Sequence, residues 1–543
     1  MKYTKHLDPA QAPQTEKAKK GQKRNSAGGY SFKLDKFGRL ERFLILGCEG
    51  GTYYSTEKKL TKENAKCVEK CLAEDPARAV KTIVDVSEAG RAPKNDPAIL
   101  ALAIVASSEN EEARKLALQN LNAVCRIGTH LFQFVDTVDK FRGWGRGLRS
   151  AVGRWYTSKS SDQLAYQLLK YQNREGWAHK DVLKLAHTDP PAELESALRW
   201  AVYGPDDLGP KTIKGKGAVK DRSYGSVGTL PALLTGYEIL KRATTTAEVV
   251  SLIETYGFTH EMIPNEWKGE KEVWEALLQK MPYTAMIRNL AKMTSIGLIA
   301  PLSKSTGLVS ERLADSEMIR KARVHPIAIL NAMKTYGRGH GLKGSLAWHP
   351  DQRVMDALNA AFYGSFSTIE PTGKNYLLGI DVSGSMTGGS VGGSPTLTPR
   401  EAAAAMAMVV ARTEKNWHCM GFFNRFIELK ISPNMRLDEV CRVMNGLPFN
   451  STDCSLPMTY ATYNNMEVDA FAVFTDNETY AGRVHPHIAL EEYRQKSGRP
   501  AVSGVFGLTS TNFTIADPDD AGQMDFVGLD SAAPSVFADF VRG

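Results

Sequence analysis

Acidic and hydroxyl side chains follow two apolar stretches in the last third of the chain. The stretch YLLGIDVSGSM, residues 376–386, ends its apolar run on Asp381 and continues with Ser383 and Ser385. The stretch AFAVFTD ends in the same way on Thr475 and Asp476. Carboxylate and hydroxyl oxygens are the ligands that hard divalent cations prefer. The two stretches therefore indicate a metal site at the ends of two strands.

A third stretch adds to this candidate site. NSTD, residues 450–453, places Thr452 and Asp453 just before an expected helix. Ser, Thr and Asp also cap helices routinely, and for any one of these loops capping is the simpler explanation. Three such loops in order favour a metal site, and we predict Mg²⁺, with Mn²⁺ as the alternative. The predicted ligands are Asp381, Ser383, Ser385, Thr452 and Asp476. Because such a set carries few charges, the ion would remain open to a carboxylate from an acidic protein partner.

The sequence around these loops alternates between strand and helix patterns. Strands are predicted in NYLLGID, HCMGFFNRFIELKI, DAFAVFTD, AVSGVFGL and MDFVGLD, and helices in REAAAAMAMVVARTEK, RLDEVCRVMNGL and PHIALEEYRQK. Alternation of this kind is typical of a doubly wound, mainly parallel sheet. Ligands of such sheets lie at the carboxyl ends of the strands, which is where the predicted ligands fall.

The chain before residue 370 has a different pattern. Its apolar residues follow helical spacing, as in PAILALAIVA, DQLAYQLLKYQ and KEVWEALLQKMPYTAMIRNLAKM, with polar, Gly or Pro connectors between them. No fixed repeat period is visible, so an α-solenoid and an irregular helical bundle both remain open. We predict a multidomain protein in which a helical region precedes an α/β domain.

Charge divides the chain at the same place. From Glu370 onward 13 Lys and Arg stand against 20 Asp and Glu, a net charge of −7, whereas residues 1–369 carry 55 against 40, a net charge of +15. A large basic region suggests a polyanionic partner, most often nucleic acid. A solubilising surface is the alternative explanation.

The composition also bears on location. No run of 18 apolar residues exists, and the first thirty residues are rich in Lys without an apolar core. We therefore expect no membrane-spanning segment and a cytoplasmic protein. The seven cysteines show no CxxC pair and no zinc-finger spacing, so we predict reduced, mostly buried thiols.

Basic residues at helical spacing mark candidate RNA contacts. Lys170 and Arg174 are four residues apart at the end of one predicted helix, and Lys180, Lys184 and His187 are spaced to share a face of the next. A second stripe has the same spacing but includes glycines that weaken the helix prediction; it consists of Arg142, Arg146 and Arg149. Any single one of these side chains could simply be solvated, but clustering favours binding.

Other motifs carry less weight. Residues 210–228 form a Gly-rich basic segment that is either a phosphate clamp or an insertion, with the insertion slightly favoured. GHGLKG matches a dinucleotide motif but follows a helical stretch, and GGSVG lacks a preceding strand and triad partners. We find no catalytic constellation and predict a protein that is not an enzyme.

Several motifs together resemble a known family. Asp-x-Ser-x-Ser, a later Thr and a later strand-end Asp resemble the metal-ion-dependent adhesion site of von Willebrand factor A domains. NSAGGY, EGGTYY, GWGRGLRSAVGRWY, REGWAHKD, EPTGK, TDCSLPM, FTDNETYAG and FTIADPDD resemble the TROVE-domain Ro ribonucleoprotein autoantigen family, from about Arg24 to the C-terminus. The resemblance implies a basic, flexible segment over residues 1–23, a ring of HEAT-like helical repeats over 24–369 and a von Willebrand factor A domain over 370–543.

The same resemblance implies a function. Family members bind small non-coding Y RNAs on the outer face of the ring, through residues that match Lys170, Arg174 and His187, and the single-stranded ends of misfolded or decaying RNAs in its hole. We therefore predict a non-catalytic RNA-binding protein for RNA quality control and stress response, with an exoribonuclease as a candidate partner. The alternative is a scaffold that holds an acidic partner through the metal site.

Overall fold

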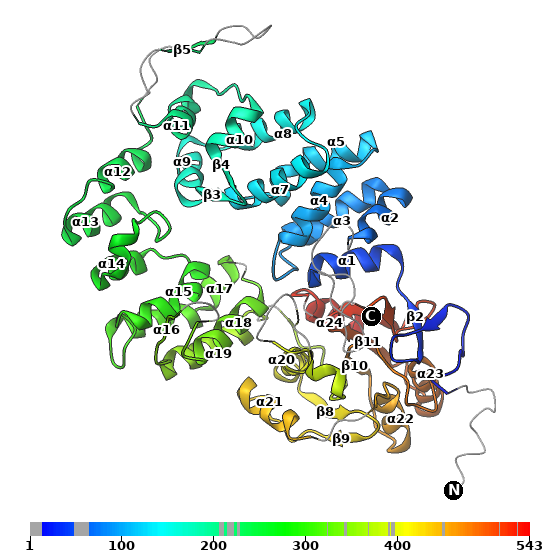
Figure 1. The fold of residues 1–543 in the computed structure, drawn as a ribbon. Helices are drawn as coiled ribbons and strands as arrows, with labels where there is room; N and C mark the ends of the chain where they lie inside the picture. Colours follow the sequence, from blue (N-terminus) through cyan, green and yellow to red (C-terminus); the bar gives the residue numbers. More distant parts are fainter. Residues whose placement is uncertain are drawn as a thin grey trace.

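The chain folds into a curved row of helices followed by a sheet domain (Figure 1). The computed structural model describes residues 13–47, 65–205, 229–322, 324–341, 345–366, 369–388, 391, 397–447, 451–509, 511–528 and 530–543, and the backbone of 211–213 and 222–224. Both predicted architectures are confirmed, since helices dominate up to residue 364 and a mainly parallel sheet follows from residue 375.

The helical row begins beside the sheet domain and turns back to it. Its first half consists of α1 (Lys36–Leu46), α2 (Lys66–Glu74), α3 (Pro76–Glu88), α4 (Asp96–Ser107), α5 (Glu111–Gln119), α6 (Leu121–Val124), α7 (Gly128–Phe141), α8 (Arg146–Thr157), α9 (Ser161–Lys170), α10 (His179–Ala186) and α11 (Ala192–Tyr203). Its second half consists of α12 (Ala232–Leu240), α13 (Thr246–Tyr256), η2 (Asn265–Gly269), α14 (Lys271–Gln279), α15 (Tyr283–Ser295), α16 (Lys304–Ala314), α17 (Ser316–Ala322), α18 (Pro326–Gly337) and α19 (Gln352–Gly364).

Two short hairpins interrupt the row. β3 (Asn173–Arg174) pairs with β4 (Trp177–Ala178) between α9 and α10, and β5 (Lys211–Ile213) pairs with β6 (Arg222–Tyr224) between α11 and α12. The second hairpin lies within the Gly-rich segment 210–228, where no pairing was predicted. The rest of that segment lies outside the described residues, so its interpretation as a clamp or an insertion stays a prediction.

Local sequence explains where many of these helices begin. Ser160 and Thr245 form capping boxes with Gln163 and Glu248, which satisfy backbone N–H groups at the starts of α9 and α13. Helix α4, whose sequence DPAILALAIVAS is apolar on almost every side, is buried along most of its length. It therefore lies inside the first half of the row, where it packs against α7, α5 and α3.

The end of the row contacts its beginning. The Nε2 of His325, just before α18, donates a hydrogen bond of 2.9 Å to the carbonyl oxygen of Arg91, in the turn between α3 and α4. The Arg91 guanidinium in turn lies 2.6 Å from the carboxylate of Asp530 in the sheet domain. The helices and the sheet domain therefore form a closed circuit, as Figure 1 shows.

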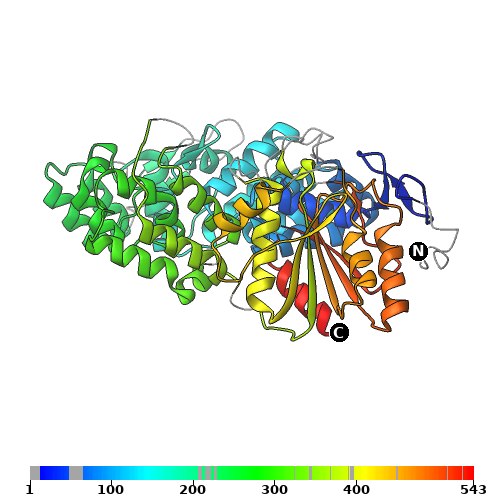
Figure 2. The same ribbon diagram turned by 90° about the horizontal axis from the view of Figure 1, so that it is seen from below.

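The sheet domain contains six strands in the order β13-β11-β10-β7-β8-β9. These are β7 (Asn375–Asp381), β8 (Asn416–Phe422), β9 (Phe426–Glu428), β10 (Ala470–Thr475), β11 (Val502–Gly507) and β13 (Gln523–Val527), all parallel except β9. The helices are η3 (Gly384–Thr387), α20 (Pro399–Thr413), α21 (Leu437–Asn445), α22 (Leu456–Tyr463), α23 (Pro486–Ser497) and α24 (Ala533–Arg542). Helices α20 and α24 cover one face and α22 and α23 the other (Figure 2). The strand order is that of a doubly wound sheet.

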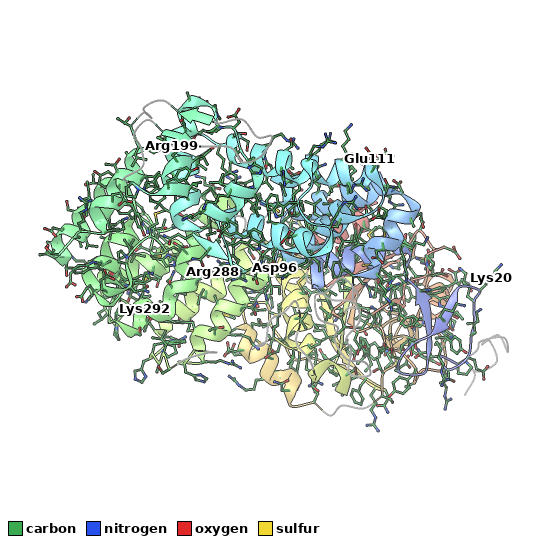
Figure 3. The ribbon with its side chains drawn as sticks, turned by 45° about the horizontal axis from the view of Figure 1, so that its top comes forward. Lys20, Asp96, Glu111, Arg199, Arg288 and Lys292 are labelled. Atoms are coloured by element: carbon green, nitrogen blue, oxygen red, sulfur yellow. The ribbon has the colours of Figure 1, made fainter. Side chains whose placement is uncertain are left out.

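The N-terminal segment packs on the sheet domain rather than on the helices. β1 (Gln22–Arg24) and β2 (Tyr30–Lys33) form a hairpin, and β2 also pairs with β12 (Phe513–Thr514). Gln14 reaches the carboxylate of Asp453 at 2.8 Å. Lys20 marks the outer edge of this hairpin in Figure 3. This packing could not be predicted from local sequence, because residues 13–23 carry no apolar periodicity and their partners lie more than 400 residues away along the chain.

Two further predictions concern membranes and cysteines. Within the described ranges, no helix is long and apolar enough to cross a lipid bilayer. The six cysteines that the structure describes are buried and form no disulfide, as predicted; Cys48 lies outside the described residues.

Candidate metal centre and basic surface

Strands β7 and β10 bring two of the predicted metal ligands together. The strands are parallel neighbours with Ile380 opposite Phe474, so Asp381 and Asp476 leave the same edge of the sheet. The Oγ1 of Thr475 donates a hydrogen bond of 2.8 Å to Oδ2 of Asp381, which links the two strand ends directly. Both carboxylates are fully buried. Asp381 and Asp476 therefore lie close enough for the shared metal site that the sequence predicted, as that prediction requires.

The two predicted serines lie beside Asp381. The backbone N–H of Ser383 donates to Oδ1 of Asp381 at 2.9 Å, and the Oγ atoms of Ser383 and Ser385 are 2.9 Å apart. Both serines are buried. The buried guanidinium of Arg400 holds this loop by donating to the carbonyl oxygens of Val382 at 2.6 Å and Ser383 at 3.2 Å. Arg400 was not among the predicted site residues, because its position depends on how α20 packs on β7.

Burial makes this carboxylate pair unfavourable without a counter-charge. Burial, and then the negative charge of Asp476, raise the pKa of Asp381 to about 7. Burial also raises the pKa of Asp476, against the effect of a hydrogen bond from Ser385. Within the part of the chain that the structure describes, Oδ2 of Asp476 has no hydrogen-bond partner. A buried carboxylate oxygen without a partner is costly unless a proton or a cation compensates it.

The residues present fit a divalent cation. Among the described residues no three His, Cys, Asp or Glu side chains gather as a metal-binding group, so any cation here would need hydroxyl ligands beside Asp381 and Asp476. Ser383 and Ser385 supply hydroxyls at this position. Hydroxyl and carboxylate oxygens match the preference of Mg²⁺.

The third loop holds the remaining predicted ligand, Thr452. Thr452 is buried, and its carbonyl oxygen accepts hydrogen bonds from the backbone N–H groups of Tyr480 and Ala481, which keeps it near the loop after β10. Its neighbour Asp453 is engaged elsewhere, because its Oδ1 accepts hydrogen bonds from Gln14 and Ser455. The carboxylates of the candidate site are therefore those of Asp381 and Asp476.

A third buried acid near this site, Glu478, was not predicted. Its Oε2 accepts a hydrogen bond of 3.0 Å from the backbone N–H of Ala27, which lies between β1 and β2. Burial, and then the charge of Asp476, raise the pKa of Glu478 to about 7. The only sequence signal was its place in FTDNET. The N-terminal hairpin is thus connected to the loop that carries Asp476.

The first cluster of predicted basic residues, from Lys170 to His187, is spread over α9, β3 and α10. Lys170 is the last residue of α9, but its side chain is only 12% exposed. Its ammonium donates to the Tyr166 hydroxyl at 2.8 Å and lies 3.8 Å from Glu261. Burial alone would lower the pKa of Lys170, but the hydrogen bond to Tyr166 and the neighbouring Tyr171 and Glu261 outweigh it, so the pKa is raised. Lys170 is charged but already engaged within the protein.

Arg174 is not on the predicted helix. Helix α9 ends at Lys170, and Arg174 lies in strand β3, where its side chain is 54% exposed and its Nε lies 3.0 Å from Oε1 of Glu175. The helical spacing of the pair was therefore wrong, because the chain turns at Tyr171. Lys180 and Lys184 are exposed on α10, and His187 is the exposed residue that ends this helix, in a left-handed conformation with φ of 49°.

The second stripe of basic residues, Arg142, Arg146 and Arg149, spans the break between α7 and α8. Arg142 ends α7 and Arg146 begins α8, so these two arginines do not share a helix as their spacing suggested; Arg149 follows in α8. Gly143, with φ of 82°, makes the break possible. The ring of Trp144 in this break lies 6.2 Å from that of Trp177 in β4. This ring contact connects the second stripe to the β3–β4 hairpin and to α10, so the two predicted clusters adjoin.

Comparison with known proteins agrees with this architecture. The chain matches the TROVE domain over residues 23–206 and 255–335 and the Ro60 vWA domain over residues 375–541. A protein of Deinococcus radiodurans named RNA-binding protein RO60 is 38% identical, over 99% of this chain and 98% of its own. The Caenorhabditis elegans protein of the same name is 37% identical, over 98% of this chain and 91% of its own. The crystal structure of the D. radiodurans RO (RSR) protein has a TM-score of 0.69 to this fold at 37% identity, covering 94% of this chain and all of that one. By sequence and by fold, the chain belongs to the Ro60 family.

Proposed function

We propose that this chain is a non-catalytic RNA-binding protein, and that RNA lies on the surface formed by the α7–α8 junction, the β3–β4 hairpin and α10. The observation that carries the proposal is the contact between Trp144 and Trp177. It brings the exposed Arg142 and Arg146 next to the hairpin and helix that carry the exposed Arg174, Lys180 and Lys184. The excess positive charge of residues 1–369 supports the same partner. Relatives named RNA-binding proteins support it independently.

We further propose which RNAs are bound. Structured small RNAs of the Y type would lie on this outer surface, where Arg174, Lys180 and Lys184 can contact phosphates of a duplex. Single-stranded 3′ ends of misfolded or decaying RNAs would enter the space that the closed circuit of helices surrounds. An exoribonuclease that consumes such ends is the proposed protein partner, in RNA quality control and stress response within the cytoplasm.

The metal site would stabilise the sheet domain and would take no part in a chemical reaction. Asp381 and Asp476 would hold Mg²⁺ with the hydroxyls of Ser383 and Ser385, and with Thr452 from the third loop. The bound ion would supply the positive charge that the buried pair lacks. The unpartnered Oδ2 of Asp476 is the observation that supports this assignment.

Salt dependence tests the RNA proposal. Fluorescence anisotropy of a labelled hairpin RNA should show binding at about 50 mM salt that weakens by several orders of magnitude at about 200 mM, since each neutralised phosphate releases counterions. Nucleic acid should also co-purify with the protein, as an excess absorbance at 260 nm that high salt removes. Absence of both effects would refute RNA binding.

A second candidate function rests on the unpartnered Oδ2 of Asp476. If the metal site holds an acidic partner, as in the metal-dependent scaffold alternative, the sheet domain should capture a Glu- or Asp-bearing peptide in Mg²⁺ and release it in EDTA. The Asp381→Ala variant should not capture it. Capture that is equal in EDTA would exclude this second function.

A further inference from the structure

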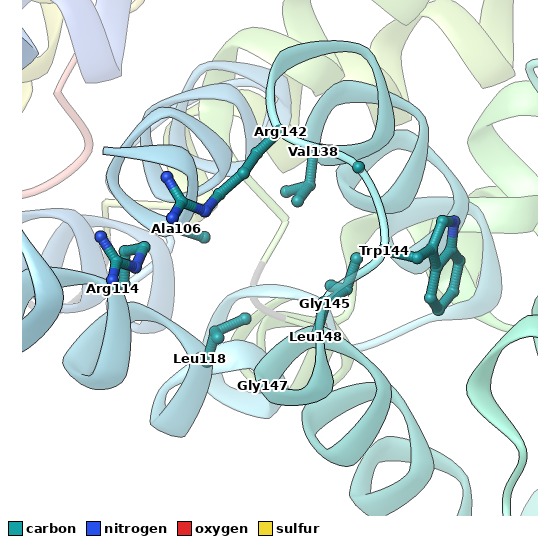
Figure 4. A pocket seen from close by; sticks show the side chains of 10 residues that line it. Ala106, Arg114, Leu118, Val138, Arg142, Trp144, Gly145, Gly147 and Leu148 are labelled. Atoms are coloured by element: carbon teal, nitrogen blue, oxygen red, sulfur yellow. The ribbon is translucent and has the colours of Figure 1, made fainter. Parts of the chain in front are cut away.

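A cavity of about 220 Å³ lies at the break between α7 and α8. Leu118 and Val138 contribute apolar walls, and the segment from Arg142 to Leu148 closes one side (Figure 4). The volume lies below that of most sites for drug-sized ligands, which begin at about 300 Å³. A phosphate group with its attached ribose is the size of ligand that suits it.

Two guanidinium groups face this cavity from the same side. Nη1 of Arg114 donates to the carbonyl oxygens of Ser108 and Glu109, each at 2.8 Å, which fixes the side chain of Arg114. Nη1 of Arg142 lies 3.2 Å from Oε1 of Glu109. Figure 4 shows the two guanidiniums side by side at the edge of the cavity. The Glu109 side chain is 95% exposed, so water weakens its attraction to Arg142. Glu109 therefore compensates the positive charge of the two guanidiniums only weakly.

The opposite side offers backbone donors. Gly145 precedes α8 and provides no side chain to accept hydrogen bonds from the first turn of the helix. A Cβ at Gly145 would meet no atom within 4 Å, so the space in front of the helix is open. A Cβ at Gly147 would lie 3.2 Å from Cδ1 of Leu118, so this wall has little room for a larger residue.

We propose that this cavity binds one phosphate group of RNA together with its ribose. The phosphate lies between the guanidiniums of Arg114 and Arg142 and the start of α8, and the ribose lies against Leu118 and Val138. Arginine forks and the N–H groups of a helix start both match phosphate oxygens. The inference rests on the proposed RNA binding and deepens it, since the cavity adjoins the surface carrying Arg146 and Trp144.

A pair of substitutions at Gly145 tests the site without weakening the fold. Gly145→Asp places a carboxylate where the phosphate is proposed to lie, and Gly145→Asn places a neutral group of the same shape there. Asp and Asn are comparably good residues at this helix position, and the backbone of Gly145, with φ of −97°, accepts either. Both variants should melt at the wild-type temperature or above. Gly145→Asp should weaken RNA binding about tenfold or more, and Gly145→Asn should weaken it clearly less.

A second pair tests the guanidiniums. Arg142→Gln should weaken RNA binding by about tenfold. The control is Arg154→Gln, which removes an exposed charge from the neighbouring helix α8; Arg154 bonds to Ser150 and does not line the cavity. Equal losses for the two variants would indicate general charge attraction and would overturn the site.

Two RNA probes distinguish a terminal phosphate from an internal phosphate as the ligand of the cavity. Single-stranded oligoribonucleotides that carry a 5′-monophosphate or a 5′-hydroxyl are compared by anisotropy. If the cavity takes a terminal phosphate, the 5′-phosphorylated probe binds more tightly, and Gly145→Asp removes that preference. If it takes an internal phosphate, both probes weaken equally in Gly145→Asp. Both results support the site.

The outcomes also separate this inference from the proposed function. Wild-type protein that binds neither RNA at low salt would overturn the proposed function and the inference with it. RNA binding that Gly145→Asp and Arg142→Gln leave unchanged would overturn the phosphate site alone. Displacement of the variant-sensitive binding by an acidic peptide but not by adenosine monophosphate would assign the cavity to a protein partner and overturn the inference.

Discussion

The helical region and the sheet domain use charge in opposite ways. In the helical region the candidate RNA-binding residues Arg174, Lys180 and Lys184 lie on the surface, where water already solvates them. In the sheet domain Asp381 and Asp476 are completely buried, and the pKa of each is raised. Surface charges can attract a long polyanion at many points, whereas a buried pair can only select one small cation. The two regions therefore suit different ligands, and each can be disabled separately.

The largest expected effect concerns RNA. Replacing Arg174, Lys180 and Lys184 together by Gln should weaken binding of a structured RNA about ten- to a hundredfold, with a salt slope smaller by about 0.9 for each phosphate that the variant no longer neutralises. An RNA bound only through a single-stranded 3′ tail should weaken much less. Anisotropy at two salt concentrations measures both.

The control for this variant is a triple substitution in the other region. Lys374, Lys430 and Arg442 are exposed basic residues of the sheet domain, and their replacement by Gln removes the same charge. This control should leave RNA affinity within about twofold. Parallel losses in both triples would show that RNA responds only to net charge.

The next effect concerns the metal. At a concentration about a hundred times its Kd, Mg²⁺ should stabilise the folded protein by about 2.7 kcal/mol through mass action. Asp381→Ala should abolish the Mg²⁺-dependent rise in melting temperature, because it removes a proposed ligand. Asp453→Asn alters a neighbouring buried carboxylate that bonds to Gln14 and Ser455, and should keep the rise. Loss of the rise in Asp453→Asn, or its survival in Asp381→Ala, would contradict the ligand assignment.

A pH effect is expected from the helical region. His179 is buried, with Tyr156 at 2.8 Å from its Nδ1, and burial lowers its pKa to about 4 from an ordinary value of 6.5. Between these values the unfolded chain binds more protons, so the contribution of His179 is fully present above pH 6.5 and is lost as the pH falls towards 4. The slope is about 1.4 kcal/mol per pH unit.

Denaturant unfolding at about pH 7 and about pH 5 measures this slope. His179→Gln removes the titrating group while keeping a side chain that can form hydrogen bonds, so its stability should depend less on pH over this range. An equal slope in the variant would mean that other groups dominate the acid response.

The smallest expected effect distinguishes the roles of Lys170 and Arg174 in stability and in RNA binding. Lys170→Met should lower the free energy of unfolding by about 1 kcal/mol, because Tyr166 loses its donor, and should change RNA affinity only about twofold. Arg174→Met should leave stability unchanged and weaken RNA binding more. If Lys170→Met gives the larger loss of RNA affinity, the Lys170 ammonium must leave Tyr166 to bind RNA.

The proximity of Asp381 and Asp476 could be predicted from the sequence better than the arrangement of the basic residues, for a physical reason. Asp381 and Asp476 end apolar strands, and parallel strands bring their carboxyl ends together, so spacing along the chain predicts proximity. Arg142 and Arg174 lie where helices end, and a shift of the helix end by a few residues redirects a side chain completely. Gln14 and Glu478 have partners more than 400 residues away along the chain, for which no local pattern exists.

The most direct test of this division measures both ligands on the same two variants. Asp381→Ala and the Arg174, Lys180, Lys184 triple are each assayed for hairpin RNA affinity and for the Mg²⁺-dependent shift in melting temperature without RNA. We predict that Asp381→Ala loses the Mg²⁺ shift and keeps its RNA affinity, and that the triple variant does the reverse. Loss of both responses in either variant, with a normal melting temperature in the absence of ligands, would contradict the separation of the two sites.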